Sequence, residues 1–525
     1  MENFNNLHSL ICLCGARSRL AAMAFAQSDL GAPQYTVESL ARAVGAVKTT
    51  GDKSAEIKML IADSRRVAPS TAFFAVPGRV TDGNNYVEEA AHRGACVVVS
   101  EKPAPKLFPA AWIQVENIAH AMAKAGKSFY GNAGGAMKTV GITGTNGKTS
   151  VSWLLQKILN DAGKKCGLIG TIHYDLGGRC LPASRTTPEA LELHAMLSQM
   201  RMAECSAVAM EISSHAIEQK RVEGLALDCA CFLNLTQDHL DYHKTMEAYF
   251  KTKASIFTGA LGSLPKAAAI NIDDPYGRKI ATMVDPSTKL ITFGIESKDA
   301  DIRAFDIKMF PQKSEFKISF AGAETQASIN MPGQYNILNA LAAVAAAVSL
   351  GVGVESAAAS LARFGGVPGR MQKAASPANF DIFVDYAHTD DALRNGLSML
   401  KSVVKGKLLV VFGCGGKRDR TKRPLMVKAV QDFADIAWAT SDNPRGEPLE
   451  QIFADMKQGV TNPDKICFVE DRRRAINLAI EAAGDGDCIL IAGKGHETFQ
   501  ELGDTIIPFD DKRVAEELLS LKQII

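Results

Sequence analysis

The sequence predicts an α/β protein of three domains, and three observations lead to that prediction. The chain has 525 residues, which is enough for two to four domains. A β-branched run at 139–143 passes through a glycine turn into a helical pattern at 151–159, as in an α/β domain that binds phosphate. After residue 366, five short apolar runs alternate with helical stretches, which is typical of a doubly wound sheet.

The composition excludes several classes of function. A hydrophobic content of 46% and a charged content of 22% are typical of an ordinary soluble protein. The net charge of +2 gives no electrostatic reason to expect binding to nucleic acid or to a membrane surface. No run of about 20 apolar residues predicts a membrane span, and the longest apolar run, at 340–350, predicts a buried helix. The 11 cysteines are scattered without metal-site spacing, which predicts free thiols in a reducing compartment.

The first 33 residues differ from the rest of the chain. They carry Arg17 and Arg19 and almost no acid before Asp29. A transit or secretory peptide could have this composition, but the apolar part is short and is broken by Gly15 and Arg17. We favour an unstructured extension, or a true start of the protein at Met23.

Residues 34–137 have a small α/β pattern. Strands are predicted at 72–76 and 95–99, and the polar triplets 63–65 and 77–79 lie at turns. Taken alone, these triplets are turn chemistry, although loops of such a domain can hold the head group of a ligand. The glycines at 133–136 predict a linker to the next domain.

The phosphate-binding loop is the clearest motif. The turn 144–147 is followed by Lys148 and Thr149 at the start of the predicted helix. Loop N–H groups and the helix dipole would face an anion, Lys148 would neutralise outer phosphates, and the Thr149 hydroxyl would reach Mg²⁺. The first glycine of the standard motif is replaced by Ile142, so an ordinary strand-to-helix turn is the alternative.

Other polar motifs follow predicted strands of the central region, 138–365. The buried strand 207–212 ends at Glu211, where an NTPase places a Mg²⁺ ligand; a helix-capping acid is the alternative. The segment 234–243 is dense in His and Asp without zinc spacing, which suits hard cations and makes His239 a candidate Mg²⁺ ligand. The segment 185–188 has the signature of a helix start, and a helix cap is its simplest interpretation.

The last region begins at the turn 367–371. Strands are predicted at 382–385, 408–412, 436–440, 466–469 and 488–491. Polar motifs follow their carboxyl ends, at 385–388, 413–420, 441–445 and 493–497, and ligands bind at that edge of a doubly wound sheet. The glycines at 413–416 do not fit a dinucleotide motif, because Arg418 holds the third glycine position and no helix clearly opens there.

Three of these motifs together resemble the Mur ligase family, the ATP-dependent amide ligases of peptidoglycan synthesis. They are TGTNGKTS at 143–150, DHLDYH at 238–243 and DNPR at 442–445, and the resemblance runs from Asp63 to the C-terminus. It implies an α/β fold of three domains after the extension at 1–33. These are a uridine-nucleotide domain at 34–137, a P-loop-like ATPase domain with a mostly parallel sheet at 138–365, and a Rossmann-like, amino-acid-binding domain at 366–525.

The resemblance also implies roles for individual residues. The catalytic set would be Lys148, Lys253, His239 and Glu211, and ATP would be bound by Gly144, Thr145, Asn146, Gly147, Lys148, Thr149, Ser150, Asn336, Arg370 and Asp385. The UDP-linked substrate would be bound by Ser64, Arg79, Val80, Thr81, Thr186, Thr187, Ser213, Gln219 and Arg221. The amino acid would be bound by Arg418, Asp442, Asn443, Pro444, Arg445, Gly493 and Glu497. The family often has Asn where Arg185 stands here, so no role is carried over to that position.

In the family, the lysine that matches Lys253 reacts with CO₂ to form a carbamate (N6-carboxylysine). That reaction replaces a cation by a carboxylate, which can bind a second Mg²⁺. Thr149, Glu211, His239 and carbamylated Lys253 are therefore the implied metal ligands for two Mg²⁺ ions. Lys251 is the competing position, and the alignment of Tyr249 with the following Lys-Ala step favours Lys253.

The DNPR motif implies the type of Mur ligase that adds meso-2,6-diaminopimelate to UDP-N-acetylmuramoyl-L-alanyl-D-glutamate, with ATP as co-substrate. A fixed arginine fork can bind the distal carboxylate of diaminopimelate in a bidentate way, and lysine lacks that carboxylate. We expect a cytoplasmic monomer in cell-wall synthesis, and hence in cell shape and division, without nucleic-acid or membrane partners. A ligase similar to folylpolyglutamate synthase and a P-loop ATPase that switches partners are the alternatives.

Overall fold

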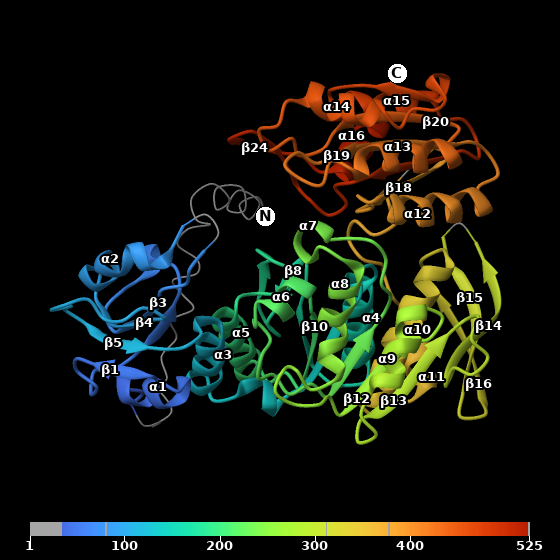
Figure 1. The fold of residues 1–525 in the computed structure, drawn as a ribbon. Coiled ribbons are helices and arrows are strands. Elements are labelled where there is room, and N and C mark those ends of the chain that lie inside the picture. The colour runs from blue at the N-terminus through green and yellow to red at the C-terminus, as the bar shows by residue number, and fades with distance from the viewer. Residues whose placement is uncertain (1–33, 79–80, 311, 376–377, 523–525) are drawn as a thin grey trace, which may run out of the picture.

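The described residues form three large sheets, one after another along the chain, and a separate two-stranded hairpin (Figure 1). The structure is a computed structural model that describes residues 34–78, 81–310, 312–375 and 378–522. The predicted extension at 1–33, and the predicted substrate residues Arg79 and Val80, lie outside the described residues. The predicted boundaries after 137 and 365 stay a prediction, and each falls between two of the sheets.

The first sheet has five strands in the order β1-β5-β4-β3-β2, parallel except for the pair β1/β5. Its strands are β1 Lys48–Thr50, β2 Met59–Ile61, β3 Thr71–Phe74, β4 Ala95–Ser100 and β5 Ala111–Gln114. The helices of this region are α1 Val37–Val44, α2 Val87–His92 and α3 Ile118–Phe129. Helix α3 packs on α5 of the central region, so the core of the first sheet continues into the next part of the chain.

The central sheet has eleven strands in the order β16-β15-β14-β13-β12-β11-β6-β10-β7-β8-β9. The seven neighbouring strands β14-β13-β12-β11-β6-β10-β7 pair in parallel. Two antiparallel strands extend the sheet at each end, β15 and β16 at one and β8 and β9 at the other. Their bounds are β6 Lys138–Thr143, β7 Cys166–Ile169, β8 His173–Asp175, β9 Cys180–Pro182, β10 Ala207–Glu211, β11 Cys229–Phe232, β12 Ala267–Asn271, β13 Lys289–Gly294, β14 Ile302–Met309, β15 Ser314–Phe320 and β16 Ala323–Ile329.

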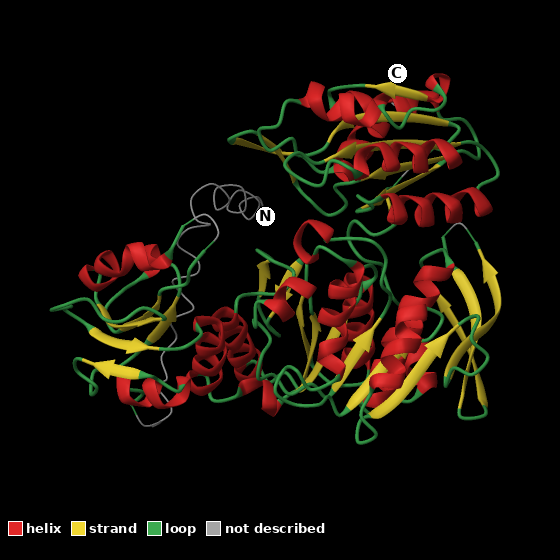
Figure 2. Cartoon of the chain, in the orientation of Figure 1, coloured by secondary structure: helices red, strands yellow, loops and turns green. Residues whose placement is uncertain are grey.

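Helices cover both faces of the central sheet (Figure 2). Helices α4, α10 and α11 pack on one face, and α5, α8 and α9 pack on the other. The predicted buried helix is α10, whose alanines pack with little exposure because small side chains allow a close approach to α4. The helices are α4 Lys148–Asp161, α5 Ala190–Met202, α6 Ser214–Glu218, α7 Leu240–His243, α8 Met246–Ala254, α9 Pro275–Met283, α10 Gln334–Ser349 and α11 Val354–Ala362.

The last sheet has six strands in the order β17-β18-β22-β19-β20-β21, parallel except for the short β17. Helices α12, α13 and α14 pack on one face, and α15 and α16 pack on the other. The bounds are β17 Gln372–Lys373, β18 Asp381–Asp385, β19 Leu408–Cys414, β20 Ile436–Ser441, β21 Ile466–Phe468, β22 Cys488–Ala492, α12 Asp390–Val403, α13 Lys422–Phe433, α14 Leu449–Lys457, α15 Arg472–Ala482 and α16 Asp511–Lys522. A separate hairpin, β23 Phe499–Leu502 and β24 Thr505–Pro508, follows β22.

These sheets confirm the predicted α/β class, with a mostly parallel central sheet and a doubly wound last sheet. The predicted linker at 133–136 lies between the first and the central sheet. Those residues form a 3₁₀ turn, Ala133–Ala136, in which Ala133 and Gly134 are buried, because the turn packs against α5. Among the described residues, no helix combines the length and the apolar character that a membrane crossing needs.

Candidate active site

A cavity of about 950 Å³ lies between the carboxyl edge of the central sheet and the last domain. Seventeen of the predicted site residues line it. These are Thr145, Asn146, Gly147, Lys148, Thr149, Ser150, Thr186, Glu211, His239, Asn336, Arg370, Asp385, Arg418, Asp442, Arg445, Gly493 and Glu497. The cavity therefore brings the predicted nucleotide loop and the predicted amino-acid loops to one space.

The nucleotide loop connects β6 to α4. Gly147 precedes the helix with a φ of 90°, a left-handed conformation that suits glycine, and a Cβ there would come within 2.3 Å of Asn339 Oδ1. The Lys148 ammonium group donates to the carbonyl oxygens of Gly144 at 2.9 Å and Thr145 at 2.8 Å. Burial lowers the pKa of Lys148, although the charges of nearby acids oppose that shift. The loop thus holds a cation over backbone carbonyls at the start of a helix.

Lys253 lies under the same loop. Its side chain is 1% exposed, and its Nζ donates to the Gly144 carbonyl oxygen at 2.9 Å and lies 4.7 Å from the centre of the Tyr249 ring. Burial, and then the charge of Lys148, hold the pKa of Lys253 well below its ordinary value. Lys251 is different, because its side chain is 74% exposed and pairs with Glu247 at 3.7 Å. The structure therefore buries the preferred lysine and exposes its competitor.

Glu211 ends β10 beneath the nucleotide loop and is fully buried. Its carboxylate accepts hydrogen bonds from the Thr149 hydroxyl at 3.1 Å and from the backbone N–H and hydroxyl of Thr171, each at 2.9 Å. The helix-cap interpretation of Glu211 is wrong, because the next helix is capped by Ser213 instead. Sequence reasoning missed Thr171, which follows the end of β7 and could have been found by the same rule of polar residues at strand ends.

His239 lies beyond Glu211 on the loop before α7. It has a left-handed φ of 54°, its Nε2 lies 3.5 Å from Asp238 Oδ2, and its ring centre lies 4.9 Å from that of His215. Across the described residues, no three His, Cys, Asp or Glu side chains gather into a group that could hold a metal ion by themselves. Any Mg²⁺ here would therefore need water or substrate oxygens as further ligands, which is common for this ion.

The last domain closes one side of the nucleotide loop. Arg370 Nη2 donates to the Thr149 hydroxyl at 3.4 Å, and its guanidinium lies 4.5 Å from the centre of the Tyr386 ring. Asp385 accepts from the backbone N–H groups of Met371 and Ala387, and burial raises its pKa. Residues on both sides of the cavity therefore contact each other directly.

Asn336 and Asp391 lie on two other walls of the cavity. Asn336, in the first turn of the alanine-rich helix α10, is buried and donates to the Pro332 carbonyl oxygen at 2.7 Å. Asp391 on α12, which the sequence did not single out, accepts from Asn146 at 3.0 Å and Thr236 at 3.3 Å. Asp391 thereby links the last domain to the nucleotide loop.

Four of the predicted substrate residues form one cluster beside Glu211. The Thr187 hydroxyl donates to the Glu211 carbonyl oxygen at 2.8 Å and accepts from the Ser213 N–H at 3.1 Å. Arg221 donates to the Thr187 carbonyl oxygen at 3.1 Å and contacts the Gln219 side-chain oxygen. The predicted helix cap at 185–188 is wrong, because α5 begins only at Ala190. The Thr187 hydroxyl bonds to Glu211 and Ser213 instead, and the Thr186 hydroxyl contacts that of Thr171 at 3.2 Å.

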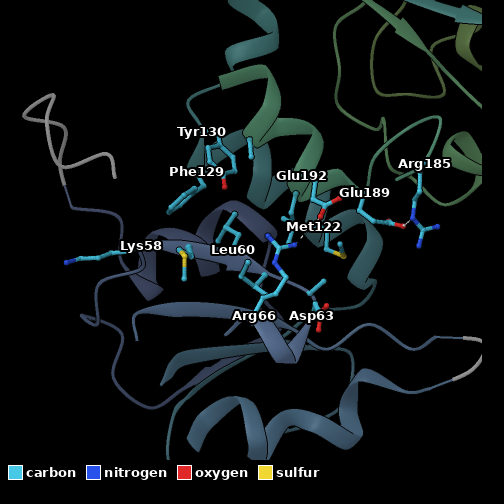
Figure 3. Close-up of a pocket in the computed structure, with 15 residues that line it drawn as sticks. Lys58, Leu60, Asp63, Arg66, Met122, Phe129, Tyr130, Arg185, Glu189 and Glu192 are labelled. Carbon is cyan, nitrogen blue, oxygen red and sulfur yellow. Dashed lines mark hydrogen bonds and ion pairs between the residues drawn. The ribbon is translucent and has the colours of Figure 1, made fainter. Parts of the chain in front are cut away.

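The remaining predicted substrate residues lie on the first domain. Ser64 is buried in a 3₁₀ turn after β2, and Thr81 is exposed. Near them is a second cavity of about 300 Å³, formed by the edge strand β2 and by α3 and α5 (Figure 3). Arg66 and Glu192 meet in it at 3.2 Å, and Lys58, Tyr130 and Arg185 also line it. Neither Ser64 nor Thr81 lines this cavity.

The predicted amino-acid site is built from loops after β19, β20 and β22. Asn443 donates to Glu497 Oε2 at 2.8 Å, and the fully buried Lys494 donates to the same oxygen at 3.0 Å. Arg445 has a left-handed φ of 50°, and its Nε donates to Glu501 Oε2 at 3.0 Å. Arg418 is exposed at the rim. Arg445 and Glu497 therefore each meet a side chain of opposite charge within the protein.

Two buried arginines hold these loops in place. Arg472 pairs with Asp511 at 2.7 Å and donates to the carbonyl oxygens of Ser441 and Ala492. Arg423 pairs with Glu447 at 2.8 Å and donates to the Gly415 carbonyl oxygen at 3.3 Å. Breaking a buried pair of this kind typically costs about 3–5 kcal/mol. Neither arginine was singled out from the sequence, because each acts on backbone carbonyls that only the fold brings near.

Comparison with known families and proteins places this arrangement in a wider group. Three family models match: "Mur ligase family, catalytic domain" at residues 56–130, "Mur ligase middle domain" at 142–347 and "Mur ligase, glutamate ligase domain" at 369–495. The UDP-N-acetylmuramoyl-L-alanyl-D-glutamate–2,6-diaminopimelate ligase 1 of Clostridium acetobutylicum is 41% identical over 485 residues, 91% of this chain and 99% of the relative. The corresponding ligase of Aquifex aeolicus is 41% identical over 463 residues, 88% of this chain and 94% of the relative.

Solved structures agree with the curated relatives. A structure of UDP-N-acetylmuramoyl-L-alanyl-D-glutamate–2,6-diaminopimelate ligase matches with a TM-score of 0.65 and 32% identity, over 91% of this chain and 98% of that one. The MurF ligase of Thermotoga maritima in complex with ADP matches with a TM-score of 0.63 and 18% identity, over 88% of this chain and 98% of that one, which shows a shared fold.

Proposed function

The chain belongs to the Mur ligase family, and on that premise we propose that it is an ATP-dependent ligase of peptidoglycan precursor synthesis. It adds meso-2,6-diaminopimelate to the D-Glu γ-carboxylate of UDP-N-acetylmuramoyl-L-alanyl-D-glutamate, as its relatives of about 40% identity are named to do. The observation that carries the proposal is the shared cavity. It is lined both by the nucleotide loop and by Asp442 and Arg445 of the DNPR motif, so a phosphoryl donor and an amino acid can meet there.

In the first step, a D-Glu γ-carboxylate oxygen attacks the γ-phosphorus of ATP, ADP leaves, and an acyl phosphate forms. Lys148 would turn from the loop carbonyls to the phosphoryl oxygens, where its charge offsets the charge that develops there. Arg370 lies within reach of the same loop through Thr149. No covalent bond to the protein is needed.

The donor set beneath the loop fits Mg²⁺. Glu211 offers a buried carboxylate with the Thr149 hydroxyl at 3.1 Å, and both are the oxygen ligands that this ion prefers. We propose Thr149 and Glu211 as ligands of one Mg²⁺, and His239 and carbamylated Lys253 as ligands of a second. When bound, the ions would neutralise charge on the transferring phosphoryl group.

The burial of Lys253 supports its carbamylation. Only the neutral amine reacts with CO₂, and the lowered pKa of Lys253 increases the neutral fraction. The nitrogen attacks the carbon of CO₂ and loses a proton, which leaves a carboxylate on the side chain. The product is an anion beside Lys148, and this opposite charge is favourable in a buried site.

In the second step, the amine of diaminopimelate attacks the acyl carbon, phosphate leaves, and the amide forms. We propose that Arg445 and Arg418 bind the carboxylates of the amino acid and that Glu497 faces its distal ammonium group. Asp442, Asn443, Pro444 and Gly493 shape this site. Closure of the last domain over the cavity would exclude water, which otherwise hydrolyses the acyl phosphate.

The UDP end of the substrate would lie toward the first domain. Thr186, Thr187, Ser213, Gln219 and Arg221 cluster between the nucleotide loop and that domain. The second cavity, about 300 Å³ with Lys58 and Arg66 on its wall, lies on that side and has the size of a small ligand pocket. We propose that Ser64, Arg79, Val80 and Thr81 bind the uridine nucleotide beside it.

The decisive experiment measures release of ADP and phosphate with each substrate left out in turn. The proposed function requires that turnover depends on both the UDP-muramyl dipeptide and diaminopimelate, with a UDP-muramyl tripeptide seen by mass spectrometry. Turnover without either substrate would instead support a P-loop ATPase that switches partners. Amide formation on a folate would support a ligase similar to folylpolyglutamate synthase. The chain shares its fold with such a synthase over 71% of its length, at a TM-score of 0.57.

We also propose that the protein works as a monomer in the cytoplasm. The nucleotide loop and the amino-acid loops that line the main cavity come from a single chain. Nine cysteines in the described part of the chain are free, as expected where thiols stay reduced. ATP and UDP-linked precursors are substrates of that compartment.

A further inference from the structure

The arginine of the amino-acid site already has a counter-ion within the protein. Arg445 Nε donates to Glu501 Oε2 at 3.0 Å, and the Arg445 backbone N–H donates to the Glu501 carbonyl oxygen at 3.2 Å. Arg445 Nη1 lies 3.5 Å from the Gly416 carbonyl oxygen, and among the described residues no partner is found for Nη2. The two side chains are 24% and 34% exposed, so water screens the pair only in part.

The position of Glu501 is fixed by its strand. Glu501 lies on β23, and its N–H donates to Asn443 Oδ1 at 3.0 Å. The neighbouring Gln500 is buried and donates to the Ser441 hydroxyl and the Asp442 carbonyl oxygen, each at 2.8 Å. Hairpin and loop are therefore bonded to each other independently of the Arg445–Glu501 pair, which holds the backbone of Glu501 beside Arg445.

We propose that Glu501 is a positioning residue that sets how strongly the enzyme prefers diaminopimelate to lysine. The inference rests on the proposed function. Because Glu501 occupies Nε, a substrate carboxylate has to approach Arg445 at Nη1 and Nη2. When an amino acid without a distal carboxylate is bound, Arg445 keeps Glu501 as its partner and no buried charge is left unpaired.

This arrangement weakens discrimination. Rejection of a substrate that lacks one polar group is strong when its absence leaves a buried partner unsatisfied. Glu501 removes that penalty for lysine, and it also places a like charge beside the carboxylate of diaminopimelate. Both effects reduce the preference for diaminopimelate.

The test is the Glu501→Gln variant of the full-length enzyme. Glutamine keeps the shape and the oxygen that accepts from Nε but removes the charge. From the usual strength of a partly exposed ion pair, we expect the ratio of kcat/KM for diaminopimelate to kcat/KM for lysine to rise about twofold to fivefold. The change should appear as a lower KM for diaminopimelate and a higher KM for lysine, with kcat nearly constant.

Two further variants make the result specific. Asp504→Asn removes an exposed charge from the turn of the same hairpin and should leave the ratio unchanged. In an Arg445→Ala background, Glu501→Gln should no longer change the ratio, because the residue through which it acts is gone. A merely structural role of Glu501 would affect both amino acids equally and would not depend on Arg445.

The outcomes separate this inference from the proposed function. A wild-type enzyme that ligates neither amino acid contradicts the proposed function. A wild-type enzyme that ligates diaminopimelate, together with an unchanged or lower ratio in Glu501→Gln and in Glu501→Ala, overturns only the role of Glu501. Persistence of the Glu501→Gln effect without Arg445 also overturns it.

Discussion

The nucleotide loop and the amino-acid loops line one cavity, but they differ in whether their charged side chains are paired within the protein. At the nucleotide loop, the ammonium groups of Lys148 and Lys253 both lie against the Gly144 carbonyl oxygen. Within the described part of the chain, neither lysine has a carboxylate within 4 Å. Burial lowers the pKa of both lysines, although the charge of nearby Asp238 opposes that shift. Because no carboxylate pairs directly with either lysine, the phosphates of ATP and a carbamate on Lys253 can act as their partners.

At the amino-acid site, charged side chains already form ion pairs within the protein. Arg445 pairs with Glu501, and Glu497 pairs with Lys494. The difference follows from the ligands proposed for the two regions. ATP always brings several negative charges, so unpaired cations favour its binding, whereas amino acids differ from one another by a single charged group. A site whose charged side chains are already paired can bind an amino acid with or without that group at small energetic cost. A single residue can therefore change the selectivity.

The largest expected effect is at the nucleotide loop, where Lys148 has no carboxylate partner. Lys148→Ala should lower the rate of acyl-phosphate formation by about 100-fold to 1000-fold, the usual effect of removing one group that stabilises the transition state. Phosphate release with all substrates present measures it. Lys157→Ala, on the exposed side of the same helix, is the matched control and should keep its rate. A Lys148→Ala enzyme with ordinary activity would remove the basis for the nucleotide-loop assignment.

Lys253 tests whether that region needs an anion. Lys253→Ala should be nearly inactive and partly restored by added short carboxylates, because the missing group is a carbamate and no longer an amine. Lys251→Ala, two residues away on the exposed face of α8, should keep full activity. Activity of Lys253→Arg equal to that of the wild type would contradict carbamylation, since a guanidinium cannot form a carbamate.

Replacement of Arg445 tests the amino-acid site, where charged side chains are paired. Arg445→Ala should lower kcat/KM for diaminopimelate about tenfold. A hydrogen bond between charged groups contributes about 1.5–3 kcal/mol, and the partly exposed Arg445 favours the lower end of that range. The value for lysine should change little, because Glu501 is partly exposed and water can solvate it once its partner is lost. Steady-state kinetics with both amino acids, at saturating ATP, give the comparison. An unchanged ratio between the two amino acids would refute the selectivity assigned to this arginine.

The sequence predicted more of the nucleotide region than of the amino-acid region, and the reason is physical. A phosphate-binding loop is a local structure, in which strand, glycine turn and lysine are adjacent in the chain. Lys148, Thr149 and their helix could therefore be predicted directly. Lys253 could be predicted only through the family resemblance, because its burial under Gly144 depends on how α8 packs.

The partners in the amino-acid region come from distant segments. Arg445 and Glu501 are 56 residues apart, and the hairpin that carries Glu501 has no motif. The sequence therefore predicted Arg445 as a fork for the substrate carboxylate without its protein partner, and the structure adds the pair with Glu501. We therefore expect the wild type to prefer diaminopimelate to lysine only about tenfold. Binding lysine does not leave Arg445 as an unpaired buried charge, because Glu501 remains its partner.

An effect smaller than those of Lys148, Lys253 and Arg445 is expected at the contact between the two regions. Asp391 accepts hydrogen bonds from Asn146 on the nucleotide loop and from Thr236, and burial raises its pKa. Asp391→Ala removes both bonds. At the lower end of their usual strength they contribute about 1 kcal/mol together, so KM for ATP should rise about fivefold. The preference for diaminopimelate over lysine should stay constant, since Asp391 touches neither Arg445 nor Glu497. Asp390→Ala, the adjacent acid on the same helix, is the control. A changed amino-acid preference in Asp391→Ala would mean that the two regions are coupled through this residue and that their charges cannot be treated separately.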